Sequence, residues 1–339
     1  MDKLKVLSLF SGIGAFEKAL SNLNINYELV NYCEIDQHAS KCYSVMHDVD
    51  ENLNLIDVTK IDTSKLKDID LITHGSPCQS FSIAGKQHGG EKGSGTRSSL
   101  LWETVRIVQD KVPKYVIWEN VKNVLKPKHR PVVDEYIQEL KDMGYTSYLP
   151  PKGFLNSKDF GIPQSRERVF VVSIRGEHEP YEFPKGFELN HDLSEFIDFR
   201  EKDDITYNFH RKYEEVVGKI SENDFLNYID NLPTTKGVGT KKMNLYSFNE
   251  MDTITTCNGL TGTLTCRNVQ NFNKKFWYNR KLYKPSPRMC FRLMGFTDED
   301  FDKVKNIGSD SDLWNRAGNS IVVNVVQEIL KNLLKDYIK

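Results

Sequence analysis

The sequence has few cysteines and none of the spacings that would place them in a disulfide framework or around a metal ion. No two of them form a CxxC pair, and no histidine cluster completes a zinc pattern. We therefore expect no metal site and a reducing, intracellular setting in which Cys78 is a free thiol. The cysteines are Cys33, Cys42, Cys78, Cys257, Cys266 and Cys290.

Long apolar runs and a charge bias are also missing. No run approaches the roughly 20 residues that a membrane span needs, and the N-terminal MDKLKVLSLFSGIG reaches Ser and Gly before a signal-peptide core forms. The formal net charge of -1 neither indicates nor excludes a nucleic-acid partner, because the distribution of charge decides that. We expect a cytoplasmic protein without a membrane partner. Its 339 residues suffice for one large domain or two.

Short apolar runs alternate with helical patterns in the first half of the chain, which is typical of an α/β sheet. The third helical pattern has the clearest apolar face and has Ser98 available as its N-cap. The expected strands are Lys5–Phe10, Glu28–Glu34, Asp70–Gly75, Tyr115–Asn120 and Arg168–Ile174. The expected helices are Ala15–Asn22, His38–His47, Ser98–Asp110 and Val132–Met143.

This alternation ends after about Arg175. Residues 176–286 are polar, rich in aromatic side chains and irregular, which indicates a second domain or a large insertion. The chain then turns helical again: SPRMCFRLMGF has Ser286 as a cap and Pro287 in its first turn, and a final amphipathic helix follows. We therefore predict one domain from residues 1–175 and 287–339, and a second from 176–286.

The stretch LSLFSGIGAFEKAL leads an apolar strand into a loop of Ser and Gly and then into a helix. Glycines allow the backbone to turn sharply and to approach a ligand at a helix N-terminus. A dinucleotide fingerprint needs a third glycine where this chain has Glu17, whose charge would also repel a pyrophosphate, so a nucleoside fits better. Glu34, at the end of the next strand, is placed to bind a ribose hydroxyl. A plain β-turn-α connection is the alternative.

Two reactive side chains lie near the ends of two further predicted strands, Asp70–Gly75 and Tyr115–Asn120. Cys78, in GSPCQSFS, lies among small polar residues rather than in an apolar core, and a thiolate is a strong nucleophile. The glycine-rich stretch after it is suited to act as a lid. Glu119, in WEN, emerges at the same sheet edge if the two strands are neighbours, and could donate a proton there. An incidental thiol and a capping glutamate are the alternatives.

Together these motifs resemble the cytosine-5 DNA methyltransferase family of bacteria and phages, in the family's order and over nearly the whole chain. FSGIG resembles its cofactor loop, PCQSFS its nucleophile motif, ENV its acid, and QSRER its paired arginines, while PRMCFRLMGF and RAGNSI resemble its last two blocks. The chain departs from the family pattern at Ser8, Ile35 and Ser76, where many members have Asp, an aromatic residue, and Pro or Phe. The resemblance implies an α/β fold, with a doubly wound, Rossmann-like methyltransferase sheet and a smaller, irregular target-recognition domain.

The resemblance also implies methyl transfer from S-adenosylmethionine to carbon 5 of cytosine in a specific duplex DNA sequence, with S-adenosylhomocysteine as product. Cys78 would attack carbon 6 of a flipped-out base, and Glu119 would bind ring N3 and the amino group. Arg168 would hold the ring carbonyl, and Arg166 would support the loop. By position in the family, the cofactor contacts are Phe10, Gly12, Ile13, Gly14, Glu34, Ile35, Asp57, Pro77, Leu100 and Asn319.

Residues 265–292 hold eight basic side chains, interleaved with aromatic residues, and no acid. Such a local excess is typical of a phosphate-binding surface, and a solvated basic face is the alternative. The expected DNA contacts in this basic block are Arg267, Lys274, Lys275 and Lys281. The resemblance adds Ser82, Lys86, Gln87 and Arg97 around the glycine-rich stretch, and Thr253 near the flipped base.

The closest alternative is an RNA cytosine methyltransferase of the same fold, but the CFT signature of tRNA-directed relatives is absent from this sequence. A catalytically silent DNA-binding protein is disfavoured by intact Cys78, Glu119 and Arg168, and a dinucleotide oxidoreductase by Glu17. We expect a monomer. The sequence is compatible with an orphan enzyme and with a restriction-modification system that pairs it with a restriction endonuclease.

Overall fold

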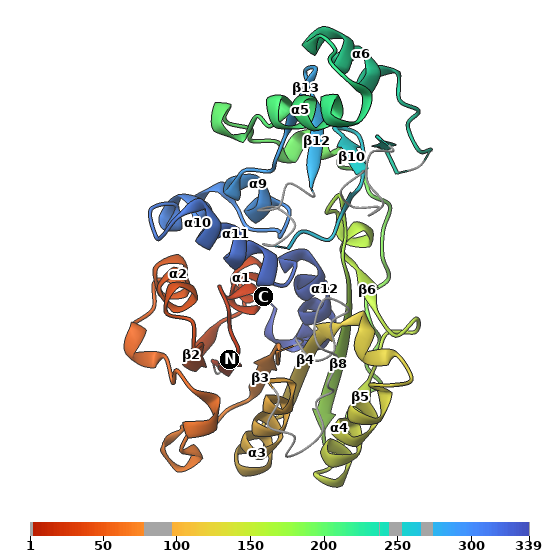
Figure 1. The fold of residues 1–339 in the computed structure, drawn as a ribbon. Coiled ribbons are helices and arrows are strands. Elements are labelled where there is room, and N and C mark those ends of the chain that lie inside the picture. Colours follow the sequence, from red (N-terminus) through yellow and green to blue (C-terminus); the bar gives the residue numbers. More distant parts are fainter. Residues whose placement is uncertain (1–2, 78–96, 237, 244–252, 266–273, 339) are drawn as a thin grey trace. The chain divides into compact units, whose positions relative to one another are not determined.

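The computed structural model describes residues 3–77, 97–236, 238–243, 253–265 and 274–338, which belong to two compact units (Figure 1). Unit 1 consists of Met1–Asn156, Glu167–Gly186 and Val323–Lys339, and unit 2 of Ser157–Arg166 and Phe187–Val322. The chain therefore changes unit at four places: 156/157, 166/167, 186/187 and 322/323. The functional division predicted from the sequence, with 176–286 as a recognition domain, stays a prediction.

Unit 1 is built on a single sheet. Its seven described strands follow the order β2-β1-β3-β4-β8-β5, with β6 paired to β8. Strands β2, β1, β3 and β4 are parallel, whereas β8 runs antiparallel to β4, β5 and β6. All five predicted strands are confirmed, each within one residue of its expected bounds. The strands are β1 (Leu4–Leu9), β2 (Tyr27–Cys33), β3 (Leu71–His74), β4 (Tyr115–Val121), β5 (Tyr145–Tyr148), β6 (Leu155–Asn156) and β8 (Glu167–Arg175).

The helices of unit 1 pack on this sheet. α3 and α4 share a core with the strands that includes Val105, Trp118 and Tyr136, and α1 packs against α12 (Figure 1). The prediction that Ser98 caps the third helix is wrong: Leu100 is the N-cap, and the Ser98 hydroxyl donates to a carbonyl of another segment. The helices are α1 (Ala15–Asn22), α2 (Gln37–His47), α3 (Leu101–Lys111), α4 (Arg130–Asp142) and α12 (Val323–Leu333).

Unit 2 contains regular structure that the sequence analysis did not delimit. Two helices, α5 (Thr206–Val217) and α6 (Glu222–Asn231), pack on a four-stranded sheet around Phe225 and Ile254. The strands of that sheet, in order, are β13 (Lys281–Tyr283), β12 (Lys275–Tyr278), β10 (Thr253–Thr256) and β9 (Thr240–Lys242). Strand β7 (Gln164–Ser165) pairs separately with β11 (Thr261–Gly262).

Three more helices of unit 2 follow these strands in the described chain. They are α9 (Pro287–Arg292), α10 (Asp298–Val304) and α11 (Asp310–Asn319). The predicted start of α9 is confirmed, because the Ser286 hydroxyl caps it by accepting from the Met289 N–H at 3.1 Å.

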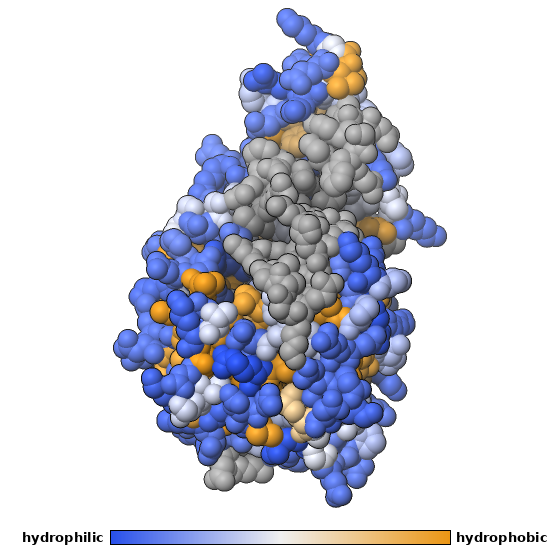
Figure 2. Space-filling view, turned by 60° about the horizontal axis from the view of Figure 1, so that its bottom comes forward, coloured by the Kyte–Doolittle hydropathy of each residue, from blue (hydrophilic) through white to orange (hydrophobic). Residues whose placement is uncertain are grey.

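Figure 2 shows one face of the molecule on which hydrophilic residues predominate and apolar residues are exposed in separate small groups. Within the described ranges, no helix combines the length and the apolar character required to span a membrane.

Candidate active site

The loop after β1 is held in a strained, compact shape that glycines make possible. Gly12 (φ 57°) and Gly14 (φ 78°) are both left-handed, and so is Phe10 (φ 53°). The Gly12 N–H donates to Glu34 Oε2 at 2.9 Å, and Oε1 of the same carboxylate accepts from the Asp36 N–H at 2.8 Å. Glu34, which the sequence analysis assigned to a ribose hydroxyl, is therefore hydrogen-bonded directly to the glycine loop and is held at its edge.

Asn54 is a site residue that the sequence analysis missed. Its side-chain oxygen accepts from the backbone N–H of Glu34 at 3.0 Å and of Ile56 at 2.9 Å, while its amide donates to the Glu34 carbonyl at 2.9 Å. Asn54 thus brings the Glu34–Ile35 and Ile56–Asp57 segments together. Ile35 is 70% exposed and Ile56 59% exposed, so this part of unit 1 presents apolar surface beside a carboxylate. An asparagine in a turn is too common to single out from sequence.

The remaining predicted cofactor residues lie in both units. Asp57 caps a short turn by accepting from the N–H and hydroxyl of Thr59, and these hydrogen bonds lower the pKa of Asp57. Leu100 is half-buried at the start of α3, and Pro77 is the last described residue before Cys78. Asn319 ends α11 in unit 2, exposed, with its amide donating to Asn315 at 3.1 Å.

His47, at the end of α2, packs on the glycine loop. Its Nε2 lies 3.0 Å from the Ile13 carbonyl oxygen, and because a carbonyl can only accept, the histidine nitrogen donates. The sequence argument that Glu17 would repel a pyrophosphate stays a prediction. Glu17 is 1% exposed and its charge raises the pKa of the buried Tyr43 after the larger effect of burial, so its carboxylate lies in the protein interior.

Replacing Gly14 with alanine is expected to weaken binding of S-adenosylmethionine, the cofactor that the resemblance implies, by about tenfold or more. A Cβ there would lie 2.1 Å from His47 Nε2, and the positive φ adds strain of about 1–3 kcal/mol. Calorimetric titration measures the change in Kd. Gly144→Ala is the matched control, because it shares a positive φ (+85°) but its Cβ would meet nothing within 4 Å. Equal affinities for the two variants would contradict the role of the loop.

Glu119 and Arg168 form an ion pair in unit 1. The Arg168 Nε lies 3.0 Å from Glu119 Oε1, with both side chains largely buried. Strand register explains the meeting: β4 and β8 are antiparallel, Glu119 lies opposite Phe170, and Arg168 lies opposite Val121 on the same face. The predicted neighbour relation is confirmed as well, because β3 and β4 are adjacent and parallel, with His74 beside Trp118.

Arg166 lies two residues earlier and binds backbone in unit 2. It is buried, and its guanidinium donates to the carbonyl oxygens of Leu264, Gly318 and Ser320 at 2.7–2.8 Å. Gln164 also binds backbone of unit 2, because its side-chain amide donates to the Leu293 carbonyl at 2.8 Å. The paired arginines of QSRER therefore have different partners: Arg166 binds two backbone segments of unit 2, one at Leu264 and one at the end of α11, and Arg168 binds a carboxylate of unit 1.

Several predicted residues fall outside the described ranges: Cys78, Ser82, Lys86, Gln87 and Arg267. Arg97 begins the turn before α3, and Thr253 begins β10. The described cysteines are free thiols. Burial raises the pKa of Cys33 to about 12, and burial also raises the pKa of Cys257, so both are poorer sources of thiolate than an ordinary cysteine.

Among the described residues of the basic block, most basic side chains are buried or paired with acids, so this part of the block does not form the uncompensated positive surface that its sequence predicts. Lys275 is 1% exposed and lies over the Phe209 ring at 4.8 Å, and Lys274 is also buried. Other basic side chains pair with acids of unit 2 that lie outside residues 265–292. These pairs are Arg280–Asp230, Lys281–Asp204, Arg288–Asp302 and Arg292–Asp298.

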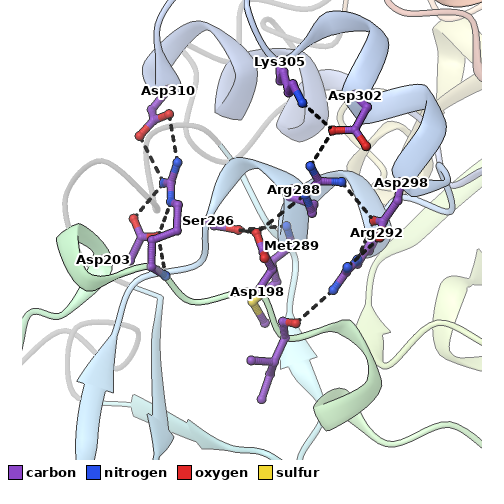
Figure 3. Close-up of polar contacts among 12 residues, drawn as sticks. Asp198, Asp203, Ser286, Arg288, Met289, Arg292, Asp298, Asp302, Lys305 and Asp310 are labelled. Carbon is purple, nitrogen blue, oxygen red and sulfur yellow. Dashed lines mark hydrogen bonds and ion pairs between the residues drawn. The ribbon is translucent and has the colours of Figure 1, made fainter.

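The arginines of α9 belong to a network of ion pairs that Figure 3 shows. Arg288 binds Asp302 at 2.6 Å and Arg292 binds Asp298 at 2.7 Å, so α9 is tied to α10. Hydrogen bonds from Arg288 and then from Lys305 lower the pKa of Asp302 to about 2. These arginines thus stabilise unit 2 internally, and their charges are already balanced by carboxylates.

Comparison with known proteins shows the family of the chain. The chain matches the C-5 cytosine-specific DNA methylase family over residues 4–335. The orphan methyltransferase M.SPRI of Bacillus phage SPR is 30% identical, over 100% of this chain and 99% of the relative. The type II methyltransferase M.HhaI of Haemophilus parahaemolyticus is 30% identical, over 97% of this chain and 94% of the relative.

Two solved structures are similar in fold. The Entamoeba histolytica methyltransferase EhMeth has a TM-score of 0.72 at 15% identity, over 100% of both chains. The Dnmt2 methyltransferase of S. pombe has a TM-score of 0.67 at 18% identity, over 99% of both chains. At these identities the two structures support the fold alone.

The chain belongs to the C-5 cytosine-specific DNA methylase family. It is a DNA (cytosine-5-)-methyltransferase, as the sequence predicts, and membership implies dependence on S-adenosylmethionine and a DNA substrate.

Proposed function

We propose that this chain methylates a cytosine flipped out of duplex DNA, with Cys78 as the nucleophile and Glu119 and Arg168 as the groups that bind the base. The Glu119–Arg168 pair carries the proposal. It is a largely buried pair of opposite charges near the end of β4, and β4 lies beside β3, the strand that leads into the Cys78 motif. The C-terminal ends of parallel strands are where such sheets place their chemistry.

The proposed side chains make a weakly nucleophilic carbon reactive. Addition of the Cys78 thiolate to carbon 6 of cytosine forms a sulfur–carbon bond and moves electron density towards carbon 5 and N3. The Glu119 carboxyl stabilises the change by hydrogen bonding to N3 and the amino group, and Arg168 binds the ring carbonyl. After methyl transfer, loss of the proton from carbon 5 breaks the sulfur–carbon bond and returns the thiolate.

S-adenosylmethionine, when bound, supplies the methyl group and leaves as S-adenosylhomocysteine. The described residues fit it. A Cβ at Gly12 would meet no atom within 4 Å, so the loop borders open space. Each carboxylate oxygen can accept more than one hydrogen bond, so the Glu34 carboxylate would hold ribose hydroxyls, and exposed Ile35 and Ile56 would offer apolar surface to an adenine ring. The proposed set is completed by Phe10, Ile13, Gly14, Asp57, Pro77, Leu100 and Asn319.

Duplex DNA is the proposed partner, and a monomer is the proposed active form. The buried side chains of Lys274 and Lys275 are not proposed again as phosphate contacts. Lys281 is half-exposed and forms an ion pair with Asp204. It is kept as a proposed phosphate contact, and binding a phosphate would require it to break that ion pair. The other proposed contacts are Ser82, Lys86, Gln87, Arg97, Thr253 and Arg267.

A trapping experiment tests the proposal. Purified protein is incubated with S-adenosylmethionine and duplex DNA that contains 5-fluorocytosine, and denaturing gels are examined for a covalent protein–DNA complex. Fluorine on carbon 5 cannot leave as a proton does, so an enzyme that attacks carbon 6 is expected to remain attached to its target. Sequencing of the trapped DNA then gives the recognised site.

Two controls make the result specific. Cys78→Ala is expected to give no complex and no methylation. Cys257→Ala removes a thiol that is hydrogen-bonded to the Trp277 carbonyl, and this variant is expected to be trapped like the unmodified enzyme. A complex with fluorinated tRNA instead of duplex DNA would transfer the assignment to RNA. Trapping of Cys78→Ala would exclude this cysteine as the nucleophile.

A further inference from the structure

Side chains from two elements hold the backbone just before Cys78. The Ser76 hydroxyl oxygen accepts from the Trp118 indole N–H at 3.0 Å, and the Ser76 carbonyl accepts from the Asn120 amide at 3.2 Å. The next carbonyl, that of Pro77, accepts from the Ser98 hydroxyl at 2.8 Å. Ser76, Trp118, Asn120 and Ser98 are all buried, so water does not compete for these bonds.

The two donors from β4 flank Glu119 in the sequence. Successive side chains of a strand point to opposite faces, so Trp118 and Asn120 share one face while Glu119 and its partner Arg168 share the other. Trp118 lies in the core between the sheet and α4, with its ring 4.8 Å from that of Tyr136. Residues 118–120 of β4 therefore place Glu119 on one face of the strand, and on the other face they donate the hydrogen bonds that hold Ser76.

The strand before Ser76 is fixed in the same core. His74, the last residue of β3, stacks on Trp118 with an interplanar angle of 8° and is hydrogen-bonded to the Tyr136 hydroxyl at 3.0 Å. Burial lowers the pKa of His74 to about 3, so the ring stays neutral and the stack keeps one form across the working pH range. The chain that leads into Ser76 is therefore anchored in the core through His74.

We propose that Ser76, Asn120 and Ser98 are positioning residues that set the path of the chain into Cys78 relative to Glu119. The inference rests on the proposed function, because it assumes that Cys78 is the nucleophile. Ser76 stands where the family pattern has Pro or Phe, and neither of those side chains can accept a hydrogen bond from Trp118. The hydroxyl contact is therefore specific to chains with this residue.

Rates of covalent trapping test the inference. Ser76→Ala and Ser98→Ala are compared with the unmodified enzyme on the 5-fluorocytosine duplex, together with kcat, the KM for DNA, the Kd for S-adenosylmethionine and the melting temperature. We expect both variants to lower kcat and the trapping rate together by about tenfold to one hundredfold, since small misplacements of reacting groups have effects of that order. The KM for DNA and the Kd for the cofactor are expected to stay within about twofold.

Ser173→Ala is the matched control, because Ser173 is also a buried serine of the same sheet, bonded to the Ser147 hydroxyl at 2.8 Å. It is expected to trap DNA at the unmodified rate. If the unmodified enzyme is trapped and both variants are trapped equally fast, the positioning role is excluded while the proposed function stands. The role is also excluded if the variants lose cofactor affinity and melting temperature in proportion to kcat. Absence of trapping in the unmodified enzyme would overturn the proposed function itself.

Discussion

Replacing Glu119 with glutamine is expected to lower kcat by about two to four orders of magnitude, the range for loss of a positioned acid. Glutamine has nearly the same shape, but it cannot share or transfer a carboxyl proton at N3 of the base. The change also leaves the Arg168 guanidinium, 3.0 Å away and largely buried, without its counter-charge. Single-turnover methylation with saturating S-adenosylmethionine measures the effect, and the Kd for S-adenosylmethionine is expected to be unchanged.

A neighbouring ion pair provides the control. Glu167, next to Arg168 in β8, binds Lys122 at 2.9 Å, with both side chains more than a third exposed. Glu167→Gln removes the same charge from the same sheet, but it changes only a side chain that pairs with Lys122 and leaves in place the backbone carbonyl that accepts from Arg168; exposed pairs contribute little to stability. Its kcat is expected to stay within about twofold of the unmodified enzyme. Equal losses in both variants would mean that Glu119 acts only through the net charge of the region.

Replacing Arg166 with methionine is expected to lower the free energy of unfolding of unit 2 by about 3–5 kcal/mol. Each of the three carbonyls that accept from Arg166 would lose its charged donor, at about 1–3 kcal/mol for each buried group, and local relaxation recovers part of the sum. Methionine keeps most of the buried volume, so the loss reports on the hydrogen bonds. Denaturant unfolding followed by tryptophan fluorescence measures it, and two transitions are expected if the units unfold separately.

Arg211→Met is the comparison for this change, because Arg211 is an exposed arginine of α5 in the same unit. A surface substitution of this kind is expected to change the free energy by less than about 0.5 kcal/mol. The pair of variants also separates two roles for Arg166. A stable Arg166→Met enzyme with a large loss of kcat would indicate direct contact with the base, whereas the hydrogen bonds to Leu264, Gly318 and Ser320 predict the opposite pattern.

Much of unit 1 could be predicted from local sequence because its signals are local. An apolar run such as Tyr115–Asn120 is buried on both faces of a sheet and has few other stable conformations. The capping serine of α9 and the glycine loop after β1 are likewise read from adjacent residues. Ser98 shows the limit of prediction from adjacent residues. A serine before a helix is a good cap, but the Ser98 hydroxyl donates instead to the Pro77 carbonyl, which is 21 residues away in the sequence.

Unit 2 was harder to predict because its determinants are distant in sequence. The basic block has no acid within residues 265–292, yet Arg280, Lys281 and Arg288 find carboxylates at Asp230, Asp204 and Asp302. The net charge of a sequence window therefore does not give the net charge of the surface on which its residues lie. Asn54 was missed for a related reason, since its role depends on two backbone N–H groups that only the folded chain brings to one oxygen atom.

The four places where the chain changes unit determine where a chimeric enzyme can be spliced. Residues 187–322 of unit 2 form one uninterrupted insert, whereas 157–166 is a short return that stays with the host. All three carbonyls bound by Arg166 lie inside that insert. A donor segment spliced near Gly186 and Val322 would therefore have to offer three carbonyls to a guanidinium from its new host, and donors that do so are the ones to try first.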